Sequence, residues 1–408
     1  MSDEVYLIDG ARTPQGRYGG GLASVRPDDL AALVVGEAVR RAGIPADAVD
    51  EVILGAANQA GEDNRDVARM AVLLAGLPHT VPGYTVNRLC ASGLTALAGA
   101  AQAIRAGEAD LVVAGGVESM TRAPWVMDKP GTPWAKPGQV HDTSLGWRFT
   151  NPRFTAADAA VPAGSGPETV KIALSMGETA EELAVLDGTT RVEADAFALR
   201  SHRRAVAAQE AGRFDREIVP VPVGNGELVR DEGPRPSTSA EKLASLRPAY
   251  REGGIVTAGN SSPLSDGAAA LVVASAAAVE RYGLTPRARV VTSASAAVQP
   301  NLMGLGPVPA TQKALARAGW HSGDLEAVEV NEAFASQVLS VMRRLKLDED
   351  LVNADGGALA LGHPLGCSGA RIVLTLLGRL EREDARRGLA TMCVGVGQGV
   401  AMLVERVQ

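Results

Sequence analysis

The sequence predicts an α/β protein made of two similar halves, with a long insertion in the first half. Short apolar runs alternate with helical patterns, which is typical of an α/β fold with a largely parallel sheet. A passage near residue 40 returns near residue 316, which indicates an internal duplication. Between Thr121 and Gly254 the chain becomes rich first in Pro, Gly and Trp and then in Arg, which favours a long loop excursion over a third core.

The first elements follow the α/β alternation in order. Val5–Ile8 has the pattern of a strand. A helix is expected from about Asp28, as its N-cap, to Ala42, with Gly43 as its stop. Glu51–Gly55 follows as a second strand. Together these segments predict the start of a layered α/β half.

The duplication is detected by three matches at one offset. "AVRRAGIPADAVDEVILG" resembles "ALARAGWHSGDLEAVEVN", and Gly43 matches Gly319, an offset of 319 − 43 = 276 residues. At that offset Ser92-Gly93 matches Ser368-Gly369, and each pair opens a helix rich in Ala or Leu. Each helix leads to an apolar strand that ends in glycine. Three matches in register predict an internal duplication, with two α/β halves of similar topology.

These features give predicted boundaries for three parts of the chain. The N-terminal half covers residues 1–120 and 255–283, because the strand-like Ala268–Val272 returns to the first half. Residues 121–254 form a loop domain, expected to bind a ligand and contact other subunits. The C-terminal half covers residues 284–408.

Size, charge and cysteine usage narrow the class of protein. A chain of 408 residues predicts two or three domains, and its net charge of −7 gives no general basic field for nucleic acid or for an acidic membrane. Three cysteines do not indicate a disulfide framework. Neither a signal peptide nor an apolar run of membrane-spanning length is apparent. We therefore expect a cytoplasmic protein, without nucleic-acid or membrane partners.

Cys90 is the first candidate for chemistry. The chain passes through "VNRLCASGL" from an extended piece directly into a helical pattern that continues to Ile104. A thiol at a helix N-terminus is expected to form a thiolate readily, because the free amides and the helix dipole favour negative charge. A small buried side chain is the alternative interpretation for this segment alone.

His363 is the second candidate, in the glycine-rich block "GGALALGHPLGCSG". By itself a lone histidine favours a structural role. At the 276-residue offset, however, Cys90 matches Gly366, so His363 precedes the second helix as Cys90 precedes the first. Packing of the two halves about a pseudo-twofold axis would bring both helix starts together, where a Cys–His pair would activate the nucleophile.

Two further blocks carry polar residues at strand ends. Val330-Asn331-Glu332 follows a strand, where the two polar side chains either cap a helix or position something at a site. "CVGVGQG", from Cys393 to Gly399, is followed by another strand, which favours a glycine hairpin over a dinucleotide site. Cys393 is an acid–base candidate or a core residue. None of these residues has the spacing of a metal site.

Together, "NRLCASG", "NEAFA", "GGALALGHPLGCSGAR" and "CVGVGQG" resemble the thiolases, in order and along the whole chain. "GARTPQGRYGG", "GGVESM" and "TAGNSSPLSDGAA" are further family-like segments. The resemblance implies a duplicated thiolase fold, in which the two α/β halves form a layered αβαβα core. It also implies a homodimer or homotetramer, and coenzyme A as cosubstrate with no permanently bound cofactor. It further implies acyl transfer between coenzyme A thioesters.

The resemblance implies a role for each catalytic candidate. Cys90 matches the nucleophile that carries the acyl group, and His363 matches the histidine that activates it and donates into an oxyanion hole. Asn331 matches the asparagine that orients a water in that hole. Cys393 matches the second cysteine, which moves a proton at the α-carbon. The amides of Cys90 and Gly395 would form the second oxyanion hole.

A second set of residues matches the substrate channel of the family. Ser262, Met303 and Phe334 match residues that line the pantetheine and acyl channel. Met176 belongs to the Met-Gly loop segment of the same substrate-binding set. Arg235 matches a basic contact near the nucleotide end of coenzyme A.

The type of thiolase is indicated by positions at which this sequence differs from the general thiolase pattern. Acetoacetyl-CoA-forming members usually carry histidine where this chain has Ser175, and many thiolases have glycine in place of Val396. The last motif, with Asn58–Pro78 and Leu145–Phe149, is similar to the 3-oxoadipyl-CoA thiolases of aromatic degradation. A general fatty-acid 3-ketoacyl-CoA thiolase and an acetoacetyl-CoA thiolase are the alternatives.

Two rivals lie outside the thiolases. A decarboxylating ketoacyl synthase would pair its cysteine with two histidines, or with a histidine and an asparagine. A non-enzymatic carrier of coenzyme A or lipid would carry a damaged catalytic set. A redox-sensing role for the cysteines is a secondary hypothesis.

Overall fold

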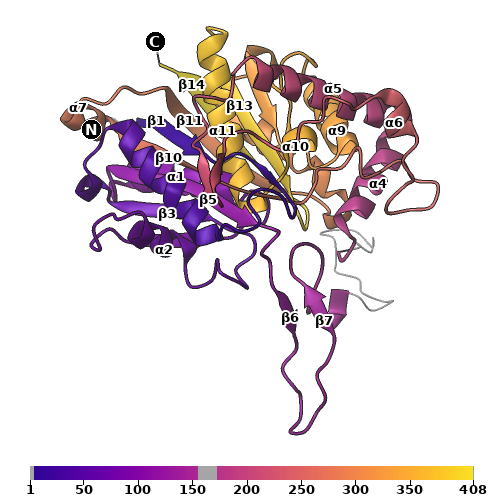
Figure 1. The fold of residues 1–408 in the computed structure, drawn as a ribbon. Helices are drawn as coiled ribbons and strands as arrows, with labels where there is room; N and C mark the ends of the chain where they lie inside the picture. Colours follow the sequence, from indigo (N-terminus) through magenta and orange to yellow (C-terminus); the bar gives the residue numbers. More distant parts are fainter. Residues whose placement is uncertain (1–3, 155–171, 408) are drawn as a thin grey trace.

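The computed structural model describes residues 4–154 and 172–407, and Figure 1 shows their arrangement. Residues 155–171 of the predicted loop domain lie outside the described part. The first half contributes the strands β1 (Val5–Arg12), β2 (Gly16–Arg17), β3 (Glu51–Gly55), β4 (Gly83–Val86), β5 (Leu111–Ser119) and β10 (Ser265–Ser275). Its helices are α1 (Pro27–Ala42), η1 (Ala46–Ala48), α2 (Val67–Leu74), α3 (Ser92–Ala106) and α7 (Ala276–Tyr282).

The second half repeats this plan. Its strands are β11 (Ala288–Ala297), β12 (Ala327–Val330), β13 (Arg387–Val394) and β14 (Gln398–Arg406). Its helices are η3 (Pro300–Leu305), α8 (Pro307–Ala318), η4 (Ser322–Asp324), α9 (Ala335–Leu345), α10 (Ala358–Leu361) and α11 (Leu365–Arg382). The insertion within the first half, between β5 and β10, contains β6 (Trp125–Met127), β7 (Val140–Asp142), η2 (Pro152–Phe154), α4 (Met176–Asp187), α5 (Arg191–Glu210), β8 (Val221–Val223), β9 (Gly226–Leu228) and α6 (Ala240–Ala244).

The strand order confirms the predicted duplication. The main path of the sheet runs β12-β13-β14-β11-β1-β10-β5-β3-β4. From the β1–β11 junction outward, β1, β10, β5 and β3 on one side correspond to β11, β14, β13 and β12 on the other. The 276-residue offset carries the start of β3 onto the start of β12 and the start of β5 onto the start of β13. The junction itself is short, with Tyr6 opposite Arg289 and Leu7 opposite Ala288.

The helices pack as the predicted αβαβα layers. α3 and α11 belong to one apolar core that includes strand residues of both halves. α1 and α2 pack on the other face of the first half, and α8 and α9 on the other face of the second. In β10, Leu271 faces the shared core and Val272 faces the outer helices of the first half. Burial on both faces explains why this strand is a continuous apolar run.

Two local predictions were wrong. The sheet is mixed and not largely parallel, because only β3–β4, β3–β5 and β12–β13 pair in parallel within the described residues. Helix α1 does end at Gly43, with φ +68°. Its N-cap, however, is Arg26 and not Asp28, because Pro27 occupies the first turn. Asp28 lies within that turn and accepts hydrogen bonds from the Arg26 guanidinium at 2.8 and 2.9 Å.

Helices α3 and α11 approach each other through glycines at their first turns. A Cβ built on Gly93 would lie 2.5 Å from the carbonyl oxygen of Gly366. One on Gly116, in β5, would lie 2.0 Å from the same oxygen, and one on Gly369 would lie 2.2 Å from the amide nitrogen of Leu94. Real Cβ atoms do not tolerate such distances, so the contact requires glycine. We call these four glycines the glycine contact; it fixes how close the halves can lie.

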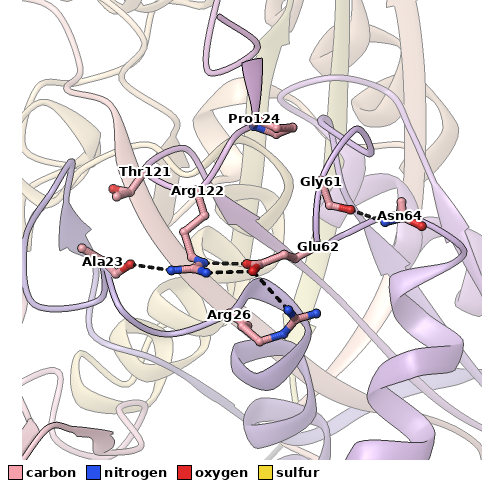
Figure 2. A pocket seen from close by; sticks show the side chains of 8 residues that line it. All are labelled: Ala23, Arg26, Gly61, Glu62, Asn64, Thr121, Arg122 and Pro124. Carbon is pink, nitrogen blue, oxygen red and sulfur yellow. Dashed lines mark hydrogen bonds and ion pairs between the residues drawn. The ribbon is translucent and has the colours of Figure 1, made fainter. Parts of the chain in front are cut away.

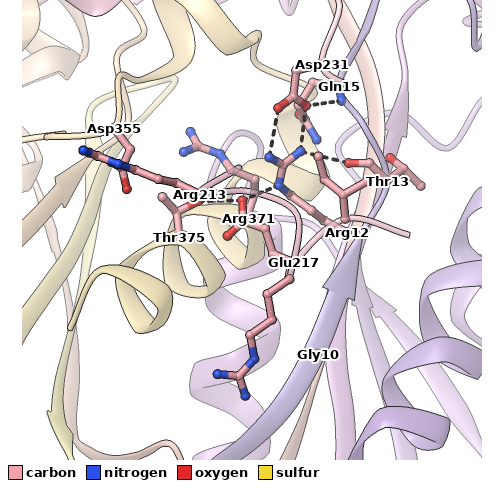
Figure 3. A network of polar contacts seen from close by, with 12 residues as sticks. Gly10, Arg12, Thr13, Gln15, Arg213, Glu217, Asp231, Asp355, Arg371 and Thr375 are labelled. Atoms are coloured by element: carbon pink, nitrogen blue, oxygen red, sulfur yellow. Dashed lines mark hydrogen bonds and ion pairs between the residues drawn. The ribbon is translucent and has the colours of Figure 1, made fainter. Parts of the chain in front are cut away.

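A buried charge network fastens the middle of the chain to β1 (Figure 3). The fully buried Arg12 donates from Nη1 and Nη2 to the two carboxylate oxygens of Asp231, at 2.7 and 2.9 Å, and from Nε to Glu217 Oε1 at 2.6 Å. Gln15 N also donates to Asp231 Oδ1, at 2.7 Å. Since each buried charge has an oppositely charged partner, the network is tolerated inside the protein and holds residues 217–231 in place.

Candidate active site

Cys90 lies in a tight turn between β4 and α3. The preceding residue, Leu89, has a φ of +47°, which is uncommon for a side chain of its size. Ser92 fixes this turn, because its Oγ accepts from Arg88 N at 2.9 Å and donates to Leu89 O at 2.6 Å. Helix α3 begins at Ser92, so Cys90 lies just before its first turn, as predicted. A strained turn held by its neighbours is a common way to present a reactive side chain.

The Cys90 thiol is protonated at neutral pH. Burial raises its pKa to about 11, and the charge of Glu118 acts in the same direction. Hydrogen bonds from the N–H groups of Gly395 and of Cys90 itself lower the pKa without offsetting burial. The expectation of a resting thiolate was therefore wrong, because desolvation of the anion outweighs the helix-start amides. The thiol needs a base at the moment of attack.

The ring of His363 is held in one orientation by its hydrogen bonds. It lies in the loop between α10 and α11, where Nδ1 is 2.6 Å from Ser368 Oγ. Ser368 Oγ in turn donates to Pro364 O at 2.9 Å, so it accepts from His363 and Nδ1 carries the ring proton. Nε2 then holds a lone pair. Burial and the charge of Arg371 lower the pKa of His363 to about 3, so the imidazole is neutral at rest.

The two polar residues that follow β12 make different contacts: Asn331 faces His363, and Glu332 binds neighbouring helices. Asn331 Nδ2 lies 3.3 Å from His363 Nε2, so it faces the lone pair of the base. Its Oδ1 is buried and has no hydrogen-bond partner among the described residues, which leaves it free to accept from a water or a substrate. Glu332 instead accepts from Ser201 Oγ at 2.6 Å and from Leu359 N at 3.1 Å, which holds α5 and α10 beside the site.

Cys393 lies near Cys90 at the end of β13. The electrostatic influence of Cys90 and, to a larger extent, burial raise the pKa of Cys393, so its thiol is protonated. The predicted glycine hairpin is confirmed, because β13 and β14 pair on either side of Gly395–Gly397. The backbone of Gly395 at this turn reaches the sulfur of Cys90.

An apolar cluster surrounds Cys393 and contains three of the predicted channel residues. Met303 and Phe334 are buried in the same cluster as Cys393, and Met176 packs against it. Met176 Sδ would lie 3.7 Å from a Cβ on Gly395, which places the start of α4 at the hairpin turn. Ser262 N donates to Ala333 O at 3.0 Å, so Ser262 lies beside the segment that contains Phe334.

Arg235 is exposed, and its hydrogen bond joins it to α5 and not to the apolar cluster around Cys393. Its backbone N donates to His202 Nδ1 at 3.3 Å, and His202 belongs to α5. Ser175 caps α4 by accepting from Glu178 N.

Glu118 is a site residue that the sequence did not single out. It is the next-to-last residue of β5 and is buried, with Oε2 accepting from Ala57 N at 2.9 Å and from Gly366 N at 2.8 Å. Oε1 accepts from Asn58 N at 3.0 Å. One carboxylate thus joins the loop after β3 to the first turn of α11. The available signal was a charged residue at the end of an otherwise apolar strand, "LVVAGGVES".

An open pocket of about 580 Å³ lies elsewhere on the first half (Figure 2). Arg122 Nε and Arg26 Nη1 both contact the carboxylate of Glu62, at 2.5 and 3.1 Å. Ala23, Gly61, Asn64, Thr121 and Pro124 complete its lining. Its charges are paired with one another and none of the candidate residues lines it, so this pocket is not the active site.

Comparison with known families agrees with this geometry. The family model for the thiolase N-terminal domain matches residues 5–277, and that for the thiolase C-terminal domain matches residues 284–406. The chain belongs to the thiolase family. Its fold and acyltransferase class are those of a thiolase, as the motifs predicted.

Named relatives match this thiolase over its full length. It is 53% identical over 414 residues to the beta-ketoadipyl-CoA thiolase of Pseudomonas aeruginosa, covering 100% of both chains. It is 52% identical over 412 residues to the 3-oxoadipyl-CoA/3-oxo-5,6-dehydrosuberyl-CoA thiolase of Escherichia coli K12, covering 99% of this chain and 100% of the relative. Human mitochondrial 3-ketoacyl-CoA thiolase in complex with CoA has a TM-score of 0.91 and 37% identity, with 99% of this chain and 98% of that chain covered.

Proposed function

We propose that this thiolase cleaves 3-oxoadipyl-CoA with coenzyme A, giving acetyl-CoA and succinyl-CoA through an acyl-Cys90 intermediate. The reverse reaction is a Claisen condensation. The convergence of Cys90, Cys393 and the Gly395 amide at the β13–β14 turn carries the proposal. Full-length relatives that are named for this substrate support the choice of acyl group. Coenzyme A acts as cosubstrate.

Acyl transfer begins at the neutral Cys90–His363 pair. His363 Nε2 accepts the thiol proton as Cys90 sulfur attacks the 3-keto carbon. The N–H groups of Cys90 and Gly395, which point at the sulfur, stabilise the oxyanion that forms beside it. Asn331 and the imidazolium of His363 stabilise the thioester oxygen as the bond between the α and β carbons breaks.

Cys393 completes the cleavage. The departing acetyl-CoA enolate takes a proton at its α-carbon from the Cys393 thiol, which is protonated at rest because burial raises its pKa. Coenzyme A then attacks the succinyl-Cys90 thioester and expels the Cys90 thiolate as succinyl-CoA forms. The coenzyme A thiol proton passes to the Cys393 thiolate, and the His363 imidazolium returns its proton to Cys90, so all three groups are restored. A decarboxylating synthase has no need of this second thiol, which favours thiolysis.

The acyl specificity is tested with four substrates. We expect kcat/KM for 3-oxoadipyl-CoA to exceed that for acetoacetyl-, 3-oxohexanoyl- and 3-oxopalmitoyl-CoA by about tenfold or more, because a dicarboxylic acyl chain offers an additional charged contact. Release of acetyl-CoA is followed for each substrate. Equal rates for 3-oxohexanoyl- and 3-oxoadipyl-CoA would point to a general 3-ketoacyl-CoA thiolase, and CO₂ release from a malonyl thioester would point to a synthase.

Residues 121–254 are the proposed loop domain for coenzyme A binding and subunit contact. Ser262, Met176, Met303 and Phe334 are the proposed channel residues, and Arg235 is the proposed contact for the nucleotide end of coenzyme A. The relative solved with CoA supports binding of a coenzyme A thioester in this fold.

A cytoplasmic location is proposed from the three free cysteines. No helix within residues 4–154 and 172–407 is long and apolar enough to cross a membrane.

The proposed oligomer is a homodimer or a homotetramer, with the β6–β7 hairpin as the tetramer contact. The hairpin extends away from the body (Figure 1), and Trp134 at its end is 100% exposed while Trp125 is 76% exposed. Large aromatic side chains in such a position favour a protein contact. We expect light scattering to give the mass of a tetramer, and Trp134→Ser to lower it to that of a dimer. An unchanged mass would exclude this hairpin.

A further inference from the structure

In the part of the chain that the structure describes, two partly buried arginines lack a partner for their charge. Arg88, two residues before Cys90, and Arg148 are partly buried. Within residues 4–154 and 172–407 they are the two partly buried arginines whose guanidinium groups form no hydrogen bond or ion pair with the protein. Other partly buried arginines are satisfied, as Arg191 is by Asp195 at 2.7 Å. A partly desolvated, unpartnered cation is costly, and a bound anion would offset that cost.

The segment that carries Arg148 is fixed at both ends to elements of the active site. Asn58 Nδ2 donates to the backbone oxygen and Oγ1 of Thr143, at 3.2 and 3.0 Å. Asn58 is also one of the donors to Glu118, so the start of the segment lies beside the loop that contacts α11. Trp147 Nε1 donates to Leu174 O at 2.9 Å, two residues before Met176. The segment therefore runs from the Glu118 loop to the start of α4.

The start of α4, where this segment ends, adjoins the apolar cluster that surrounds Cys393. Met176 packs against Met303, Phe334 and Cys393, and its sulfur adjoins the Gly395 turn that contacts the Cys90 sulfur. Methionine and phenylalanine side chains suit an alkyl chain but give no partner for a carboxylate. A terminal carboxylate left unpaired in such surroundings would bind poorly. A dicarboxylic acyl group thus needs a cation at the border of this cluster.

We propose that Arg148 binds the terminal carboxylate of the acyl chain and thereby selects dicarboxylic over neutral 3-oxoacyl-CoA substrates. This inference rests on the proposed function, and it identifies Arg148 as the residue that determines acyl specificity. The guanidinium donates two N–H groups to the two carboxylate oxygens, a geometry that lysine cannot reproduce. Thr143 and Trp147 hold the segment, so Arg148 is presented with little loss of backbone freedom on binding.

The test compares two substrates of equal chain length, 3-oxoadipyl-CoA and 3-oxohexanoyl-CoA, in the full-length enzyme. Arg148→Met keeps most of the aliphatic stem and removes the charge. We expect it to lower kcat/KM for 3-oxoadipyl-CoA by roughly 10- to 100-fold and to leave that for 3-oxohexanoyl-CoA within about threefold. Arg148→Lys should restore part of the preference. Thermal unfolding of each variant checks that the fold is intact.

Arg88→Met is the matched comparison, since Arg88 is the other unpaired cation. Loss of the preference in Arg88→Met but not in Arg148→Met would overturn the assignment. An equal loss for both substrates in Arg148→Met would also overturn it, because it would indicate a structural role. A wild-type enzyme without preference for 3-oxoadipyl-CoA would contradict the proposed function itself, which separates that failure from failure of the Arg148 assignment.

Discussion

Cys90→Ala is expected to lower thiolysis of 3-oxoadipyl-CoA by at least about 10⁴-fold, because the reaction loses the atom that carries the acyl group. The remaining contacts still bind substrate, so binding of coenzyme A thioesters should persist. Initial rates of acetyl-CoA release measure the effect. Cys367→Ala is the matched control: Cys367 is also a free cysteine, but it is buried within α11 and takes no part in the proposed chemistry. Turnover retained in Cys90→Ala would exclude Cys90 as nucleophile.

The same assignment predicts a covalent intermediate. Incubation with 3-oxoadipyl-CoA in the absence of free coenzyme A should leave a succinyl group on Cys90, detectable by peptide mass spectrometry. An acyl group found on Cys393 would reverse the roles of the two thiols.

The reactivity of Cys90 with iodoacetamide should increase with pH over an unusually wide range. Its pKa is raised to about 11, so the thiolate fraction grows about tenfold per pH unit below that value and levels only near it. The alkylation rate of Cys90, measured in the absence of substrate, gives this profile. A plateau near pH 8 would show that the thiolate is present at rest and that His363 is not needed to form it.

Gly93→Ala is expected to impair both folding and catalysis. Its new Cβ would lie 2.5 Å from Gly366 O and 3.1 Å from Ala370 N, which are backbone atoms that cannot rotate away. Separation of α3 from α11 should cost about 1–3 kcal/mol of unfolding free energy. It should also lower kcat by about 10²-fold, because Cys90 and His363 each lie three residues before a glycine of this contact and would move apart. Urea unfolding and steady-state kinetics measure the two effects.

Gly99→Ala, in the same helix, is the control. The nearest atom to its new Cβ is Tyr84 Oη at 3.7 Å, an ordinary contact. Alanine should there stabilise α3 by up to about 1 kcal/mol and leave kcat unchanged. If both glycines gave the same loss, the glycine contact would not control the distance between the halves.

The framework of the site was predictable because repeats and motifs are local in the sequence. The 276-residue offset gave the matching order of strands on either side of the β1–β11 junction. The "CVGVGQG" motif gave the β13–β14 hairpin, and the "NRLCASG" motif placed Cys90 at a helix start.

What the sequence could not give depends on contacts between distant segments. The Cys90 pKa was predicted in the wrong direction, because helix position is visible in the sequence and desolvation by packed neighbours is not. The ring orientation of His363 depends on Ser368, and the joining role of Glu118 depends on amides up to 248 residues away. The prediction of a largely parallel sheet was wrong because β10 and β14, one in each half, each run antiparallel to both of their neighbours in the main sheet path.

The glycine contact makes the catalytic centre an interface within a single chain. The proposed nucleophile, Cys90, belongs to one half and its proposed base, His363, to the other, and no side chain separates the backbones of the glycine contact. Each half could therefore keep its own sheet and outer helices and still be inert, because the pair of reacting groups exists only while the halves are docked. Activity is in this sense a direct measure of docking, and it should disappear before either half loses its secondary structure.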